Sequence, residues 1–176
     1  MGLFLQTAIL PDCKETEARE ALKKIAARFD LIPEECRYKE YAGGTAILLN
    51  EDCVGYDTLA KAISKALKKA ALLLYTYDGD YWGYFLFDNG KEIDMFDSVP
   101  DYFEEVSEKE KQEVKGNAKL ISDYFHVEES SIKNYLVFWT GEMTDKKAYE
   151  DDEFEYLDCW QMADFMKRLG YPYEWE

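Results

Sequence analysis

The sequence predicts a fold of the α+β class, and three observations lead to this prediction. Two amphipathic helical patterns alternate with short apolar or β-branched runs in the first 77 residues. Asp88-Asn89-Gly90 separates two runs of strand-forming residues, and Asn-Gly is a strong hairpin signal because both turn residues accept a positive φ. Hydrophobic residues make up 47% of the 176 residues, which supplies a sizeable core and argues against global disorder.

The first 77 residues predict six elements. In order, they are a strand over residues 3–10 that Pro11 ends, a helix over 12–29 opened by a capping box from Asp12 to Glu15, an edge strand over 37–41, a strand over 45–49, a helix from Asp57 or Thr58 to about residue 70, and a strand over 72–77. This βαββαβ order is typical of a ferredoxin-like sandwich, in which two helices cover one face of an antiparallel sheet.

The hairpin strands over 81–87 and 91–96 then extend this sheet to five or six strands. Both faces of the first hairpin strand are apolar, so we expect both to be covered. A C-terminal helical segment follows. It contains an irregular stretch at 98–103, a helix over 107–125 weakened at Gly116-Asn117, a short helix from residue 130 to 138, an exposed acidic loop over 141–155, and a helix from Asp158 that ends before Gly170. We therefore expect a ferredoxin-like sandwich with hairpin over 1–97 and an acidic helical extension over 98–176 that packs on the same domain.

Charge divides the sequence into two unlike parts. Residues 1–77 hold 11 basic and 11 acidic side chains, whereas residues 78–176 hold 10 basic and 26 acidic ones, so the net charge of −16 lies entirely in the second part. All four tryptophans lie there too. Such a field repels nucleic acids and anionic membranes and attracts basic proteins or cations. The alternative is that the excess charge only promotes solubility.

The hairpin and the segment after it predict a partner-binding surface. Its candidate residues are acidic or aromatic, a combination that suits basic ligands through ion pairs and cation–π contacts. They are Asp78, Asp80, Trp82, Asp94, Asp97, Asp101 and Tyr102. The alternatives are that the aspartates are ordinary turn residues and that the rings pack in the core. The lysines at 61, 65, 68 and 69 form a basic helix face that we interpret as solvated surface.

No catalytic residue, metal ligand or cofactor is predicted. The four cysteines, Cys13, Cys36, Cys53 and Cys159, form no C-x-x-C pair, and His126 is the single histidine. Asp78-Gly79-Asp80 matches a calcium loop only weakly, because the other ligand positions are missing. An enzyme is therefore the less favoured interpretation. Its most concrete form is a small metal-assisted hydrolase, which requires at least three hairpin carboxylates to converge on one point.

Two longer patterns carry a resemblance. They are Y-D-G-D-x-W-G-Y-x-L-x-x-N-G-K-E-I-D-x-F with P-D-Y-F at 100–103, and C-W-Q-M-x-D-F-M-x-x-L-G-Y-P at 159–172. Together they resemble a group of uncharacterised bacterial cytoplasmic proteins, and the resemblance implies no activity or catalytic residues. Small size and acidic charge are also similar to immunity proteins, which neutralise basic toxins by surface complementarity.

These observations predict a non-enzymatic, immunity-like protein whose acidic, aromatic surface binds a basic protein partner. A homo-oligomer that uses the aromatic surface as its interface is the remaining alternative. We expect a cytoplasmic location with reduced thiols, because residues 1–6 lack the features of a signal peptide and no apolar run is long enough to span a bilayer.

Overall fold

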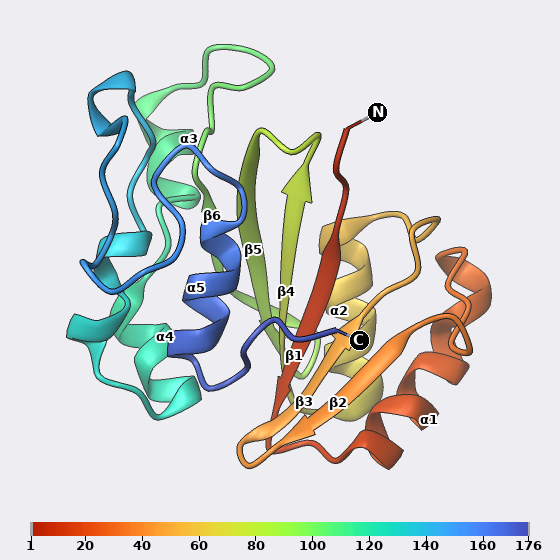
Figure 1. Ribbon diagram of the computed structural model, residues 1–176. Coiled ribbons are helices and arrows are strands. Elements are labelled where there is room, and N and C mark those ends of the chain that lie inside the picture. Colours follow the sequence, from red (N-terminus) through yellow and green to blue (C-terminus); the bar gives the residue numbers. More distant parts are fainter. Residues whose placement is uncertain (1, 176) are drawn as a thin grey trace. The chain divides into compact units, whose positions relative to one another are not determined.

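The computed structural model describes residues 2–175 and has a mixed α+β architecture, which confirms the predicted class (Figure 1). The strands are β1 (Gln6–Pro11), β2 (Arg37–Tyr41), β3 (Gly44–Leu48), β4 (Ala70–Tyr77), β5 (Tyr81–Asp88) and β6 (Lys91–Asp97). The α-helices are α1 (Glu15–Ile25), α2 (Tyr56–Leu67), α3 (Glu108–Glu113), α4 (Ala118–Phe125) and α5 (Gln161–Arg168). Short 3₁₀ turns are η1 (Ala26–Arg28), η2 (Glu129–Ser131), η3 (Lys133–Tyr135) and η4 (Gly141–Met143).

The strands form one six-stranded antiparallel sheet in the order β2-β3-β1-β4-β5-β6. Strand β1 pairs with β3 on one side and with β4 on the other, so that Ile9 lies opposite both Ala46 and Leu72. Strand β2 pairs with β3, with Tyr38 opposite Ile47. The prediction that the hairpin extends the sheet to as many as six strands is therefore confirmed.

The chain divides into two compact units, each built from several segments of the sequence. Unit 1 comprises the chain up to Leu3, Thr76–Tyr84 and Asp94–Tyr173, and unit 2 comprises Phe4–Tyr75, Phe85–Ile93 and the chain from Glu174 onward. The hairpin is shared because its aromatic end is built into unit 1: the Trp82 indole donates to Gln161 Oε1 at 3.2 Å, and Phe96 forms a β-bridge with Lys115.

In unit 2, α1 and α2 pack on one face of the strands, as their apolar stripes predict (Figure 1). Leu22 of α1 and Ile63 of α2 join Ile47 of β3 in one fully buried cluster. The polar face of α2 is solvated: Lys61, Lys65 and Lys68 are exposed.

The chain around Pro11 differs from the prediction. Pro11 is the last residue of β1 rather than its terminator, because its backbone still pairs opposite Gly44. Asp12 has a φ of 53° and does not cap a helix. Helix α1 begins at Glu15, and Glu17 accepts the backbone N–H of Lys14 at 2.9 Å, so the predicted Asp12 capping box is wrong. The start of α2 also moves, to an N-cap at Gly55.

Two hairpin turns bracket β5. Asn89 and Gly90 have φ values of 50° and 78°, which confirms the predicted Asn-Gly turn. Asp78 and Gly79 also adopt positive φ, at 53° and 79°, and Asp80 N–H donates to the Tyr77 carbonyl at 2.9 Å. Asp78-Gly79-Asp80 is therefore a β4–β5 turn, in agreement with the turn-chemistry alternative.

Three predicted helix starts or ends in unit 1 are confirmed. Ser107 and Glu110 form the predicted capping box of α3. The helical stretch splits at Gly116-Asn117, where the Asn117 side chain accepts the Leu120 N–H and starts α4. Gly170 follows α5 with a φ of 92°. The predicted short helix over 130–138 is instead the pair of 3₁₀ turns η2 and η3.

Candidate functional site

A group of aromatic rings, of which Phe103 is exposed, Tyr77 and Tyr102 are half-buried and Tyr81 is buried, lies where the β4–β5 turn meets the segment after β6. We call Tyr77, Tyr81, Tyr102 and Phe103 the aromatic patch. The turn stacks Tyr77 on Tyr81 with ring centroids 5.6 Å apart. Phe103 is 71% exposed, the highest value among the exposed large hydrophobic residues of the described chain. The Phe103 ring is therefore the part of this group that faces solvent most fully.

Three rings of the patch stand steeply to one another. The centroids of Tyr77, Tyr102 and Phe103 are separated by 5.0 to 5.6 Å, with interplanar angles of 68° for the two tyrosines and 83° for each tyrosine with Phe103. The three rings therefore pack edge to face, and their faces point in different directions. Such faces carry the negative part of the aromatic quadrupole and attract cations.

Local hydrogen bonds fold the segment after β6 toward the turn. Ser98 Oγ donates to the Trp82 carbonyl at 2.8 Å, and Asp97 accepts the Val99 N–H at 2.8 Å. Tyr102 N–H then donates to the Val99 carbonyl at 3.0 Å. These contacts explain why residues 98–103, predicted as irregular, reach the β4–β5 turn.

Carboxylates surround the aromatic patch. The Tyr102 hydroxyl donates to Asp80 Oδ2 at 2.6 Å, and this bond raises the pKa of the Tyr102 phenol to about 12. Asp78 and Asp80 are both exposed. Asp101 is exposed as well but pairs with Lys111 Nζ at 2.8 Å, which lowers the pKa of its carboxyl. We call Asp78, Asp80, Asp101 and the aromatic patch together the acidic aromatic surface.

Three predicted residues lie away from this surface. Trp82 is fully buried, with its ring 5.0 Å from that of Phe96 and 5.2 Å from that of Phe165, so its indole belongs to the core of unit 1. Asp94 accepts the Tyr84 hydroxyl at 2.6 Å and the Asn117 N–H at 2.9 Å, and burial raises the pKa of its carboxyl. The Asp97 carboxylate accepts the Val99 N–H within its own turn, as described above. The structure thus brings together Asp78, Asp80, Asp101 and Tyr102 from the predicted set.

The predicted site residues include Tyr102 but neither Tyr77 nor Phe103, whose rings lie next to it. From the sequence, the rings of this stretch suit either a partner interface or the core. Their signal is weak in the sequence, because the buried Trp82 and the exposed Phe103 both stand among carboxylates and other rings. Trp82 is buried and Phe103 is exposed because of contacts with residues that are distant in the sequence.

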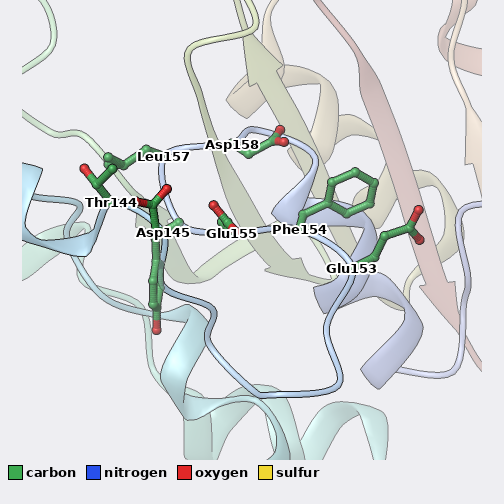
Figure 2. Close-up of a pocket in the computed structure, with 8 residues that line it drawn as sticks. Thr144, Asp145, Glu153, Phe154, Glu155, Leu157 and Asp158 are labelled. Carbon is green, nitrogen blue, oxygen red and sulfur yellow. The ribbon is translucent and has the colours of Figure 1, made fainter.

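A second acidic feature of unit 1 is an open hollow in the loop before α5 (Figure 2). Its volume is about 350 Å³, and its lining holds four carboxylates beside apolar and hydroxyl side chains. The lining residues are Thr144, Asp145, Glu153, Phe154, Glu155, Tyr156, Leu157 and Asp158. Most of them belong to the stretch predicted as an exposed acidic loop. The carboxylates of the hollow therefore add to the negative charge of unit 1.

Electrostatics connects the end of this loop with the β4–β5 turn. Burial raises the pKa of the Cys159 thiol to about 11, and the charges of Asp158 and Asp80 contribute to the rise. Asp158 lines the hollow, and Asp80 belongs to the acidic aromatic surface. The two acidic features thus act on the same thiol.

A partly buried arginine site forms a third feature of unit 1. Arg168 donates to Asp152 Oδ1 at 2.9 Å, to Asp151 Oδ1 at 2.6 Å and to the Tyr135 hydroxyl at 3.3 Å. Its guanidinium carbon lies 4.9 Å from the centroid of the Tyr149 ring. Tyr135 in turn donates to Asp152 Oδ1 at 2.6 Å. We call these five residues the arginine clamp.

The described residues contain neither a metal-ligand cluster nor an exposed thiol. Within residues 2–175, no group of three or more His, Cys, Asp or Glu side chains is arranged to hold a metal ion. The four thiols are buried, and burial raises their pKa values, to about 11 for Cys13 and about 12 for Cys53. A high thiol pKa disfavours the thiolate that a nucleophile requires. His126 is exposed at the C-terminus of α4.

No protein-family model, curated protein or solved structure matches the chain. Across residues 2–175, none of the helices combines the length and apolar character needed to cross a membrane. A functional proposal for this chain therefore rests on the acidic aromatic surface itself.

Proposed function

We propose that this chain is a non-enzymatic interaction protein that binds a basic protein partner through the acidic aromatic surface. The observation that carries the proposal is Phe103, which is 71% exposed and lies against Tyr102, whose hydroxyl is bonded to Asp80. Aromatic side chains supply much of the energy of protein interfaces, and a surrounding ring of charge selects the partner.

The charge distribution supports a basic partner. Residues 78–176 carry 26 acidic and 10 basic side chains, so a negative field surrounds this part of the chain. Such a field accelerates encounters with positively charged proteins and disfavours nucleic acids and self-association through the same patch. The charge and size also support an immunity-like role in the cytoplasm, consistent with the resemblance to bacterial proteins.

We infer that the first four strands, with α1 and α2, form a ferredoxin-like scaffold. The support is the order β1-α1-β2-β3-α2-β4 along the chain with the spatial order β2-β3-β1-β4 and antiparallel pairing throughout. In this proposal, the scaffold fixes β4, whose last residue Tyr77 begins the aromatic patch.

The metal-assisted hydrolase gains no support. It requires at least three carboxylates around one point, and the described part of the chain holds no such group. Asp94 and Asp97 instead accept hydrogen bonds from Tyr84 and Val99. The binding role is therefore the function that the geometry favours.

Comparative affinity capture tests the proposal. The full chain and a triple variant, Asp78→Asn, Asp80→Asn and Phe103→Ser, are immobilised and incubated with lysate of the source cell at about 50 mM salt, then washed at about 500 mM salt, because screening weakens exposed charge pairs. We expect the native chain to retain a basic protein that the high-salt wash releases and that the variant fails to retain.

A matched control removes the same kind of charge elsewhere in unit 1. The substitutions Glu128→Gln and Glu129→Gln neutralise two exposed carboxylates near η2 and are expected to leave retention unchanged. Equal retention by the native chain and the triple variant would refute the proposal. Light scattering on the same samples tests the oligomer alternative, which predicts that Phe103→Ser lowers the molecular mass in solution.

A further inference from the structure

Unit 1 contains three hydrogen-bonded tyrosine–aspartate pairs. The hydroxyls of Tyr84, Tyr102 and Tyr135 donate to Asp94, Asp80 and Asp152, each with an oxygen–oxygen distance of 2.6 Å. A carboxylate has about four acceptor sites, so one hydroxyl leaves room for further donors. The three pairs differ in which further groups donate hydrogen bonds to the aspartate.

Two of the pairs are completed within unit 1. Asp94 also accepts the Asn117 N–H at 2.9 Å. Asp152 also accepts the Tyr149 N–H at 3.0 Å and the Arg168 guanidinium at 2.9 Å. Asp80 is different: the hydrogen bonds and ion pairs among residues 2–175 give its carboxylate the Tyr102 hydroxyl and no second donor.

The arginine clamp is an internal example of the missing contact. There, one guanidinium binds a carboxylate that also holds a tyrosine hydroxyl, and it lies over a second aromatic ring. The Tyr102–Asp80 pair has the same two groups, and Tyr77 and Phe103 supply ring faces beside it. The surface pair thus repeats the clamp without the arginine.

We propose that the Tyr102–Asp80 pair, with the rings of Tyr77 and Phe103, binds one arginine side chain of the basic partner. This inference rests on the proposed function and specifies its central contact. The guanidinium donates to the Asp80 carboxylate while its plane stacks on the exposed ring of Phe103. Arginine fits better than lysine because its planar fork combines carboxylate binding with stacking, whereas the ammonium of lysine is a compact, strongly hydrated charge.

The occupant follows from charge complementarity. Asp78 and Asp80 are exposed carboxylates, and Asp80 makes only the bond to a neutral hydroxyl. The nearby Lys111 is already held by Asp101 at 2.8 Å. A cation from another protein therefore completes the site, and the exposed Phe103 ring makes it accessible.

The test uses two peptides that differ only in the cation. Acetylated and amidated Gly-Gly-Arg-Gly-Gly and its lysine counterpart are titrated into the full chain, and the ring signals of Tyr77, Tyr102 and Phe103 are followed by NMR. We expect the arginine peptide to bind about three-fold more tightly than the lysine peptide, the size of one exposed cation–π contact. Asp80→Asn and Phe103→Leu are each expected to remove this preference, whereas Glu129→Gln leaves it unchanged.

An octalysine peptide separates failure of this inference from failure of the proposed function. If octalysine shifts the ring signals but the two short peptides bind equally, or if Asp80→Asn keeps the arginine preference, the arginine inference is overturned and the basic-partner proposal stands. If neither octalysine nor the arginine peptide shifts the ring signals, both are overturned. Backbone amide spectra of each variant verify the fold, and Asp80 and Phe103 are exposed.

Discussion

Replacing Arg168 with methionine is expected to lower the free energy of unfolding of unit 1 by about 3 kcal/mol. The loss falls mainly on Asp152, whose side chain is only 2% exposed, because removal of one partner of a buried pair leaves an uncompensated charge worth roughly 3–5 kcal/mol. Asp151 adds little, since its side chain is 77% exposed. The Tyr149 cation–π contact adds about 0.5–1 kcal/mol. We take the lower end because the Arg168 side chain is itself 25% exposed.

Urea denaturation followed by tryptophan fluorescence measures this loss, since Trp82, Trp139 and Trp160 all belong to unit 1. In a thermal scan, the same change corresponds to a fall in Tm of about 6–12 °C for a domain of this size. Arg28→Met is the matched control: Arg28 is exposed and lies over Phe29 in unit 2, so its loss is expected to cost under about 1 kcal/mol.

A second substitution tests whether the buried charge is the cause. Adding Asp152→Asn to Arg168→Met neutralises the carboxylate while keeping an oxygen that accepts the Tyr135 hydroxyl. We expect the double variant to be more stable than Arg168→Met alone by about 1 kcal/mol or more. The reasoning is refuted if Arg168→Met costs no more than Arg28→Met, or if the second substitution lowers stability further.

Three further predictions concern single contacts. Tyr84→Phe removes the hydroxyl that donates to the half-buried Asp94 and is expected to lower the free energy of unfolding in urea by about 1–2 kcal/mol. A loss below about 0.5 kcal/mol would show that this hydrogen bond does not stabilise the fold. Gly90→Ala is expected to destabilise the hairpin by about 1 kcal/mol, because φ is 78° and the new Cβ would lie 3.1 Å from Lys65 Cβ; an unchanged Tm contradicts it. Burial raises the pKa of Asp164 in the folded state, so its contribution to stability is present at low pH and is lost as the pH rises through that pKa. Asp164→Asn is therefore expected to gain stability relative to the native chain as the pH rises through this titration, and a difference in urea midpoint that is constant with pH contradicts the prediction.

Features of this chain that depend on neighbours in sequence were predictable. Asn89-Gly90 specifies its turn because both residues tolerate positive φ, and Ser107 with Glu110 specifies a helix start because each side chain bonds the other's backbone. The helix periodicities placed Leu22 and Ile63 in the core. The α+β class follows from the order of such local signals.

Pairing with distant strands overrode local signals in some places. Pro11 lacks a backbone N–H but still lies in register opposite Gly44, and the next residue, Asp12, donates its N–H to the Gly43 carbonyl at 2.8 Å. The turn that Asp12 makes moved the start of α1 to Glu15. The residues next to Pro11 in the sequence do not indicate that it pairs with Gly44.

The candidate site was decided by tertiary structure. In the sequence, Trp82 and Phe103 are both aromatic residues among carboxylates, yet Trp82 is buried against Phe165 of α5 and Phe103 is exposed. Likewise, Asp94 and Asp80 each bind a tyrosine, but only Asp94 receives a second donor, from Asn117. The sequence by itself determined how much acid and aromatic surface this protein has and roughly where along the chain it lies. Which of those groups face solvent depends on burial and hydrogen bonds between residues many positions apart, and these exist only once the chain has folded.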